Sequence, residues 1–316
     1  MNQNTHNLPA DHDARLRRAL LSLQGLSVGD AFGEKFFVSE QVVRRRLEHR
    51  DPPPPPWFWT DDTAMAISIV RTLRECGGID RDHLATHFAQ SYDREPHRGY
   101  GGMARSILRA MNEGVSWEIA SAQVFDGMGS YGNGGAMRAG PLGAYFAGSY
   151  KEAAEHARAS AQVTHAHEEG QAGAIAVAVA AAWAAQADDA ATGEQMLDTV
   201  LEWTPEGETR SGLARTRKLG LHLEPEHMAG LVGCGWRVSA QDTAPFAVWC
   251  AARSFRSYPE ALWQTASALG DVDTTCAIVG GIVALSAHGE NGIPAEWLAA
   301  REPLPADFNF DSTQTS

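Results

Sequence analysis

The sequence predicts an all-α protein, and three observations support this fold class. Alanine and glycine are abundant along the 316 residues, with 31 glycines, whereas runs of β-branched residues are scarce. Apolar residues recur at helical spacing in one segment after another. No alternation of apolar and polar residues persists for more than a few positions, so no strand is predicted. We expect a single domain at residues 14–303, between a disordered tail at 1–13 and a polar tail at 304–316.

Composition limits the kinds of partner. The net charge of −13 argues against binding to a nucleic-acid backbone or an anionic membrane, although a small anionic ligand can still meet a local site. The four cysteines are far apart and lack CxxC spacing, which is typical of reduced core residues in a cytoplasmic protein. The N-terminus lacks the apolar core of a signal peptide, and the longest apolar run, 172–187, is shorter than a membrane span. The oligomeric state stays open.

The first predicted helix occupies residues 14–28 and leads into a glycine motif. Glycines at positions 25, 29 and 33 recur every four residues, so they would leave one bare helix face for close packing. A charged segment follows at 40–51. The five prolines at 52–56 cannot form a helix and predict a stiff connector. This connector leads to the first of two acidic clusters.

The two acidic clusters have similar sequences, WTDDT at residues 59–63 and GDVDTT at residues 270–275. Each precedes an apolar segment of helical character, at 64–73 and 276–287, so both are predicted helix N-termini. Threonine and aspartate are favoured there because they cap exposed amides and suit the positive end of the helix dipole. Capping alone explains either cluster taken by itself.

Together the clusters hold four carboxylates, and this number indicates a further role. Closely packed carboxylates repel one another unless a cation or protons neutralise them. Oxygen ligands of this kind suit a hard divalent cation such as Mg²⁺, Mn²⁺ or Ca²⁺. We therefore hypothesise a binuclear metal site that joins Asp61 and Asp62 to Asp271 and Asp273. An EF-hand does not explain the second cluster, because the loop glycine and the closing glutamate are absent at the required offsets.

Two other stretches carry chemistry. The loop at residues 127–135 has five glycines, which permit close backbone approach to a ligand or simply form turns. His165 and His167 would point in different directions on a helix and make a poor metal pair, so His165 is either a surface or capping residue or a contact to a ligand. The remaining predicted helices are at 80–92, 103–112, 151–166, 172–187, 246–256 and 258–269.

Several motifs taken together resemble the ADP-ribosylglycohydrolase family. They are GLSVGDAFG at 25–33, WTDDT at 59–63, RGYG at 98–101, SYGNGGAMR at 130–138, TH at 164–165 and GDVDT at 270–274. They occur in the family's order and cover most of residues 20–290. The forms at 98–101 and 130–135 look most like the branch that removes ADP-ribose from serine.

The resemblance implies an all-α fold, a single compact orthogonal multi-helix bundle of the ADP-ribosylglycohydrolase type, with two Mg²⁺ or Mn²⁺ ions in a cleft. By motif position it implies that the metal ligands are Thr60, Asp61, Asp62, Asp271, Asp273 and Thr274. It also implies a binding set near the diphosphate and distal ribose of ADP-ribose, partly through backbone amides: Gly101, Ser130, Tyr131, Gly132, Asn133 and His165. An apolar or aromatic neighbour would stack on the adenine.

One position departs from the family pattern. The serine-type branch carries a glutamate four residues after the glycine equivalent to Gly33, where this chain has Phe37. Glu34 is three residues earlier, about one helical turn away. It either replaces the family glutamate, if this segment is helical, or is an ordinary solvated acid.

The resemblance implies metal-dependent hydrolysis of the glycosidic bond between ADP-ribose and a modified serine or arginine side chain of a protein, with release of ADP-ribose. The bond breaks through an oxocarbenium-like transition state, and bound metals would lower the pKa of the attacking water. Asp62 and Glu34 are the candidates for proton transfer. The alternatives are hydrolysis of another adduct, such as O-acetyl-ADP-ribose or ADP-ribosylated nucleic acid, and a non-catalytic ADP-ribose binder.

Overall fold

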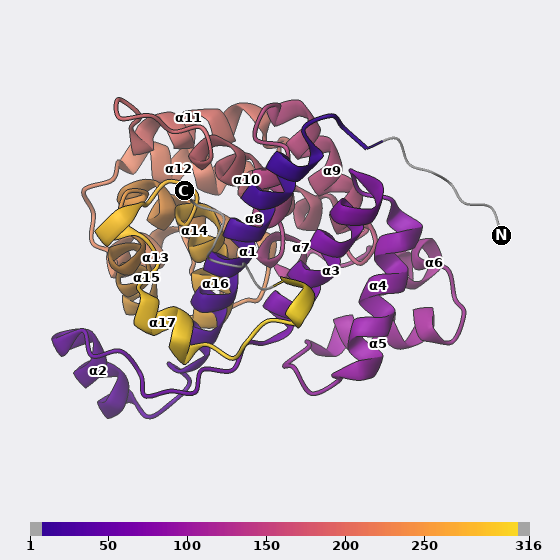
Figure 1. Ribbon diagram of the computed structural model, residues 1–316, viewed down its shortest axis with the longest axis horizontal. Helices are drawn as coiled ribbons and strands as arrows, with labels where there is room; N and C mark the ends of the chain where they lie inside the picture. The colour runs from indigo at the N-terminus through magenta and orange to yellow at the C-terminus, as the bar shows by residue number, and fades with distance from the viewer. Residues whose placement is uncertain (1–7, 309–316) are drawn as a thin grey trace.

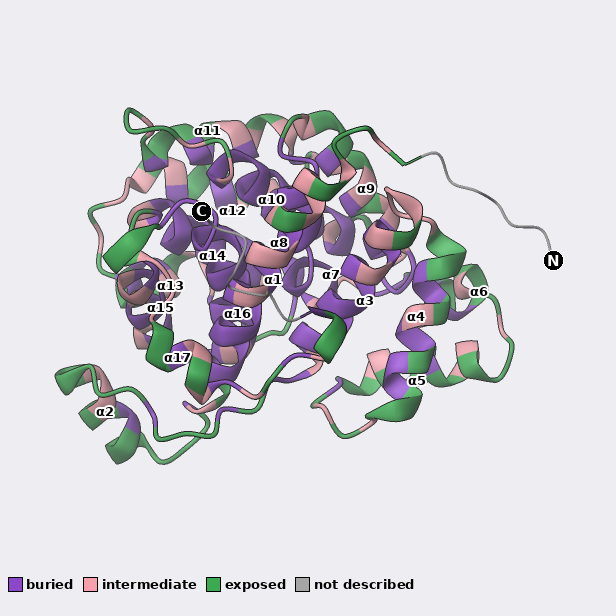
Figure 2. Ribbon diagram, in the orientation of Figure 1, coloured by how far each residue is buried: buried purple, intermediate pink, exposed green. Residues whose placement is uncertain are grey.

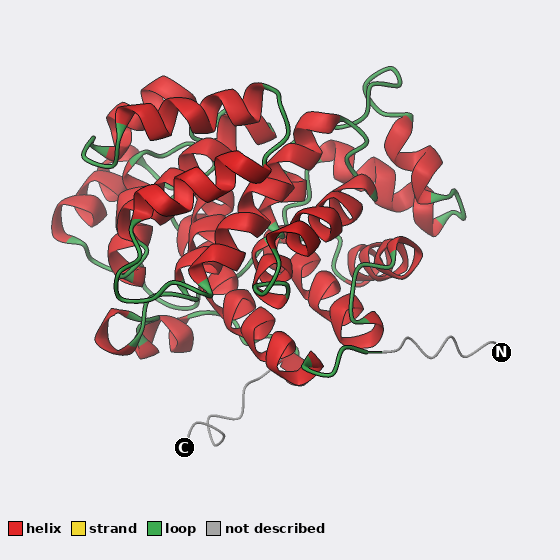
Figure 3. Cartoon of the chain, turned by 90° about the horizontal axis from the view of Figure 1, so that it is seen from above, coloured by secondary structure: helices red, strands yellow, loops and turns green. Residues whose placement is uncertain are grey.

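The computed structural model describes residues 8–308, and within this range the chain forms helices and no β-strand (Figure 3). The all-α prediction is therefore confirmed. Two isolated backbone bridges join loops, one between Trp57 and Arg301 and one between Gly132 and Ser239. Parts of both predicted tails, residues 1–7 and 309–316, lie outside the described residues.

Two helices that are distant in sequence, α1 (His12–Glu34) and α16 (Val272–Val283), pack together at the centre (Figure 1). A Cβ atom at Gly29 would lie 2.1 Å from the carbonyl oxygen of Cys276, and one at Gly33 would lie 2.4 Å from that of Val272. The backbones approach this closely because glycine has no Cβ. The predicted bare glycine face is confirmed. The predicted end of the helix at residue 28 is wrong, because the same glycines let α1 continue along α16 to Glu34.

The interior is built around α10 (Glu168–Ala184) and α14 (Ala240–Ser254), which are mostly buried (Figure 2). Every residue of α10 from Gly170 onward is buried, so the alanine-rich run is a core helix as predicted. Its small side chains let three neighbours pack against it: α7 (Gly134–Met137), α8 (Gly140–Tyr145) and α9 (Tyr150–Gln162). Among the described helices, none has the length and apolar character needed to cross a membrane.

The other helices surround this centre. On one side α3 (Asp61–Cys76) packs against α1 and leads outward to α4 (Arg81–Arg94), α5 (Gly102–Asn112) and α6 (Trp117–Ala122) (Figure 1). Four more helices cover the opposite side: α11 (Gly193–Trp203), α12 (Glu208–Leu219), α13 (Pro225–Val232) and α15 (Tyr258–Ser267). The mostly exposed α2 (Glu40–His49) projects from the body (Figure 2). The described part of the chain ends with η1 (Gly289–Asn291), α17 (Ala295–Ala300) and η2 (Ala306–Phe308).

The C-terminal segment returns to the start of α3. Trp57 N donates to the carbonyl oxygen of Ala300 at 2.8 Å, and Glu302 N donates to that of Trp57 at 2.7 Å. Beyond residue 303, where the sequence suggests a polar tail, Leu304 and Phe308 are buried. This segment therefore packs beside the first acidic cluster.

Candidate active site

The two acidic clusters begin α3 and α16, so both are helix N-termini, as predicted. Thr60 is the N-cap of α3, and its Oγ1 accepts a hydrogen bond from Asp62 N at 3.4 Å. Asp271 occupies the N-cap position of α16 without a side-chain capping bond. Capping therefore accounts for a side chain in the first cluster but not in the second.

Both helix N-termini border one cavity of about 420 Å³. The cavity brings together residues that lie more than a hundred positions apart in the sequence. Of the residues singled out above, those that line it are Asp61, Asp62, Gly101, Ser130, Tyr131, Gly132, Asn133, His165, Asp271, Asp273 and Thr274. Thr60 and Glu34 do not line it.

Burial is the main reason why the pKa values of the four aspartates in the two clusters are raised. The pKa of Asp61 rises to about 7, because the side chain is buried and the carboxylates of Asp30 and Asp271 are near. Burial, and then neighbouring carboxylates, raise the pKa values of Asp62 and Asp273 well above their ordinary range. Burial also raises the pKa of Asp271, although Asn133 Nδ2 donates to Asp271 Oδ2 at 2.6 Å. The cavity therefore disfavours four ionised carboxylates unless protons or a cation neutralise them.

The donor set fits a divalent cation. Asp62 Oδ1 and Asp273 Oδ1, one from each cluster, are buried and have no hydrogen-bond partner in the described part of the chain. A buried carboxylate oxygen without a donor is costly, and a hard cation satisfies it. Across residues 8–308, no three His, Cys, Asp or Glu side chains already surround a common metal position. Each cluster thus offers one buried carboxylate oxygen, without a partner in the described residues, to an ion.

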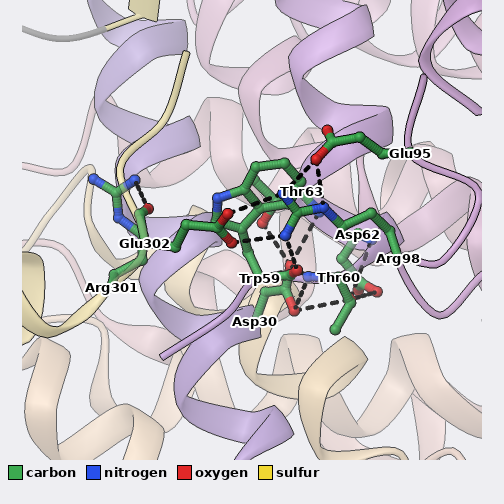
Figure 4. A network of polar contacts seen from close by, with 9 residues as sticks. All are labelled: Asp30, Trp59, Thr60, Asp62, Thr63, Glu95, Arg98, Arg301 and Glu302. Carbon is green, nitrogen blue, oxygen red and sulfur yellow. Dashed lines mark hydrogen bonds and ion pairs between the residues drawn. The ribbon is translucent and has the colours of Figure 1, made fainter. Parts of the chain in front are cut away.

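Asp30, on α1, shapes the first cluster and was not among the predicted site residues. Its side chain is fully buried and accepts hydrogen bonds from the backbone amides of Thr60 and Thr63, at 2.9 and 3.1 Å, and from both threonine hydroxyls. Figure 4 shows Asp30 beneath the turn that these residues form. Burial raises the pKa of Asp30 to about 6, against the lowering effect of these hydrogen bonds. Asp30 therefore holds the turn that presents Asp61 and Asp62.

Arg98 contacts the same turn from the other side (Figure 4). Its guanidinium lies over the Trp59 ring, 3.4 Å from the centroid, and Nη1 donates to the Trp59 carbonyl oxygen at 3.1 Å. Two nitrogens of the guanidinium donate to Glu302 at 2.7 and 3.0 Å, and Arg98 also pairs with Glu95. The arginine of the RGYG motif thus connects the acidic turn to the C-terminal segment.

The glycine-rich loop is fixed partly by its own amides. Gly132 N donates to Ser130 Oγ at 3.2 Å, and Asn133 N donates to the carbonyl oxygen of Val238 at 3.2 Å. Two of the amides expected to bind a diphosphate are therefore used inside the protein. The Asn133 side chain instead contacts Asp271, which ties this loop to the second acidic cluster.

The two histidines have different roles. His167 is the N-cap of α10, where its Nδ1 accepts a hydrogen bond from Glu169 N at 3.1 Å. His165 is buried, lines the cavity and lies beside the glycine-rich loop. His165 is therefore neither a surface residue nor a helix cap, and its contact with a ligand stays a prediction.

Comparison with known proteins identifies the family. The family model described as ADP-ribosylglycohydrolase matches residues 11–310. The chain belongs to the ADP-ribosylglycohydrolase family. The members of this family are hydrolases that act on ADP-ribose glycosidic bonds.

Relatives of the family differ in how much of this chain they match. ADP-ribosylhydrolase ARH3 of Homo sapiens is 31% identical over 320 residues, which cover 87% of this chain and 86% of that protein. ADP-ribosyl-[dinitrogen reductase] glycohydrolase of Rhodospirillum rubrum is 30% identical over 167 residues, 50% of this chain and 53% of that protein. A solved ADP-ribosylglycohydrolase-related protein complex has the same fold, with a TM-score of 0.63 at 24% identity, covering 92% of this chain and 94% of that chain.

The position that departs from the family pattern, Phe37, lies three residues beyond the end of α1. Glu34 is the last residue of this helix, so its segment is helical, yet the residue is exposed and does not line the cavity. Partial burial raises the pKa of Glu34, and its charge contributes to raising the pKa of Asp273. Phe37 is 55% exposed. Glu34 is therefore near the ADP-ribosylglycohydrolase cavity but outside it.

Two further cavity residues were missed by sequence reasoning. Phe125 stacks on Tyr131 with ring centroids 5.4 Å apart, and both line the cavity. Arg138, the last residue of the SYGNGGAMR motif, is fully buried at the cavity wall, with its guanidinium 4.4 Å from the centroid of Phe88. The motif itself was a signal for Arg138, whereas no pattern in the sequence points to Phe125.

Proposed function

We propose that this protein hydrolyses the bond between ADP-ribose and a serine or arginine side chain of a modified protein, and that it uses two divalent cations, Mg²⁺ or Mn²⁺. The observation that carries the proposal is the meeting of two acidic helix N-termini on one cavity, each with a buried carboxylate oxygen that lacks a partner in the described chain. Thr60, Asp61 and Asp62 would hold metal from α3, and Asp271, Asp273 and Thr274 from α16.

The layout of the cavity supports an orientation for ADP-ribose. The aromatic pair Phe125 and Tyr131 suits the adenine, because flat rings stack. The loop then runs from Tyr131 to Asn133, whose side chain contacts Asp271, so the distal ribose would lie at the acidic end. The diphosphate would lie between them, near Ser130, His165 and the N-terminus of α5 at Gly101, whose dipole favours an anion.

In this orientation, individual side chains would have separate roles in the reaction. When bound, the cations would fix the ribose hydroxyls, ionise the surrounding carboxyl groups and lower the pKa of the attacking water. Asp62 would accept the proton of that water, since its Oδ1 is otherwise without a partner among the described residues. Glu34, the other candidate, would have to turn toward the cavity. The fully buried Asp30 would keep the turn that carries Asp62 in place.

The test is release of ADP-ribose. The protein with Mg²⁺ is incubated with serine- and arginine-ADP-ribosylated peptides, with O-acetyl-ADP-ribose and with an ADP-ribosylated oligonucleotide, and free ADP-ribose is measured. We expect release from at least one peptide, and a loss of about 100-fold or more in Asp62→Asn. The exposed Asp189→Asn serves as the matched control and should retain activity. Tight ADP-ribose binding without release from any substrate would instead show a binder without turnover.

A further inference from the structure

Three side chains at the cavity wall, those of Arg138, Thr164 and His165, form a hydrogen-bonded chain. Arg138 Nη2 donates to Thr164 Oγ1 at 2.9 Å, and Thr164 Oγ1 lies 2.7 Å from His165 Nδ1. Arg138 cannot move freely, because it is fully buried, stacks on Phe88 and also donates to the carbonyl oxygen of Ser160 at 3.0 Å. The buried guanidinium of Arg138 therefore fixes the position of the Thr164 hydroxyl.

The direction of these hydrogen bonds follows from the donors available. A guanidinium only donates, so Thr164 Oγ1 accepts from Arg138. The hydroxyl has one proton to give, and in residues 8–308 the acceptor within hydrogen-bond distance of it is His165 Nδ1. Nδ1 is then an acceptor, and in a neutral imidazole the hydrogen must be on Nε2.

The other ring nitrogen, Nε2, lies beside the glycine-rich loop. Nε2 lies 3.4 Å from the position that a Cβ atom would take at Gly132, and also 3.4 Å from that position at Gly134. The ring stays neutral, because burial and then the charge of Arg138 lower the pKa of His165 to about 3. A neutral ring with Nε2–H presents one hydrogen-bond donor to whatever lies along this loop.

We propose that Arg138 and Thr164 are positioning residues that hold His165 as the neutral Nε2–H tautomer, so that it donates to the diphosphate of ADP-ribose at the glycine-rich loop. The identity of the ligand rests on the proposed function, whereas the tautomer is a property of the protein without ligand. The donor matters because Gly132 N and Asn133 N are already used inside the protein.

The first arm of the test reads the tautomer directly. Nitrogen-15 NMR of histidine-labelled, ligand-free protein distinguishes Nδ1–H from Nε2–H, and His165→Gln assigns the resonances. We expect Nε2–H in the wild type and in Thr164→Ser, and a mixture of tautomers in Thr164→Val, which keeps the shape but removes the hydroxyl. An Nδ1–H form of His165 in the wild type overturns the proposal, whatever the protein hydrolyses.

The second arm measures the Kd for ADP-ribose by calorimetry. Thr164→Val should weaken binding by about fivefold, the weight of roughly one hydrogen bond, while Thr164→Ser should stay within about twofold of the wild type. Thr72→Val is the matched control, because it removes an equally buried hydroxyl that donates to the carbonyl oxygen of Ser68 at 3.0 Å, far from the cavity. Equal Kd values for Thr164→Val and the wild type overturn the role in binding. Absence of wild-type binding instead contradicts the proposed function, and the NMR arm still decides the tautomer.

Discussion

At the scale of single residues, Asp30 determines how the first acidic cluster is presented. It accepts hydrogen bonds from two backbone amides and two hydroxyls of the turn at Thr60 and Thr63. These donors are buried, so their hydrogen bonds have no substitute in solvent, and loss of an acceptor leaves a desolvated group unpaired. The Asp30 carboxylate therefore influences the site by fixing the conformation of this turn.

This role predicts a difference between two substitutions. Asp30→Ala leaves the two amides without an acceptor and should reduce the free energy of unfolding by about 3 kcal/mol. Asp30→Asn keeps one oxygen for both amides, so we expect a loss below about 1 kcal/mol. Urea unfolding of both variants measures these values, and the exposed Asp13→Asn on the same helix is the control. Equal losses in the two Asp30 variants would show that charge, not hydrogen bonding, is what this position supplies.

Some residues of the site could be predicted from the sequence, and others could not. The four carboxylates of the two clusters attract notice because acids so close together need neutralisation, and that argument requires no structure. Asp30 has no such neighbours in sequence, and its partners are thirty positions away. The sequence did contain an indication that Asp30 has a special role, because it is the one charged residue between Arg18 and Glu34. The sequence contains no such indication for Phe125, because an aromatic residue in a loop is ordinary until its stacking partner is known.

At the scale of elements, contact between α1 and α16 aligns the two halves of the site. Gly33 of α1 packs against the backbone of Val272 and Asp273, so the start of α16 is positioned directly by α1. Asp30, one turn earlier on the same helix, positions the start of α3. A single helix thus sets the relative placement of both acidic N-termini.

Close packing of these helices predicts the effect of a single methyl group. Gly29→Ala would place a Cβ atom 2.1 Å from the Cys276 carbonyl oxygen, which forces the two backbones apart. We expect a loss of about 3 kcal/mol in the free energy of unfolding, at the upper end of overpacking costs. Gly230→Ala is the control, because nothing lies within 4 Å of its Cβ position. It sits inside α13 and should gain about 0.5 to 1 kcal/mol from helix propensity. Similar outcomes for the two variants would mean that α1 and α16 are not in close contact.

Element positions were more predictable from sequence than element ends. The starts of α3 and α16 follow from capping residues before apolar segments, and the alanine-rich run of α10 follows from its composition. The end of α1 was missed, because glycines and an aspartate normally indicate a turn, and only the partner helix explains why they stay helical. Burial of Leu304 and Phe308 likewise depends on surfaces that the sequence does not display.

At the scale of the whole molecule, a buried acidic site couples stability to pH. The folded-state pKa of Asp61, about 7, exceeds the ordinary value of 3.8, so the folded protein binds more protons than the unfolded chain between these limits. The contribution of this group to stability is therefore present below about pH 4 and is lost as the pH rises to about 7. His165 has the opposite slope, because burial lowers its pKa to about 3 and its contribution increases as the pH rises toward 6.5.

A comparison with Asp61→Asn isolates the acidic contribution, since the histidine is common to both proteins. In the presence of a chelator, Asp61→Asn should be more stable than the wild type, and the difference should widen by about 2 kcal/mol between pH 5 and pH 7. Urea unfolding at the two pH values measures this change. Excess Mg²⁺ should narrow the gap at pH 7 by stabilising the wild type. A difference that does not depend on pH would contradict the raised pKa of Asp61.

We propose above that the two acidic helix N-termini form one site for divalent cations. Counting bound Mn²⁺ by electron paramagnetic resonance tests it most directly, with the wild type and one variant from each cluster, Asp61→Asn and Asp273→Asn. We expect two Mn²⁺ ions per chain in the wild type and weaker binding, by about tenfold or more, in each variant. No bound Mn²⁺ in the wild type, or affinity unchanged by either substitution, would contradict it.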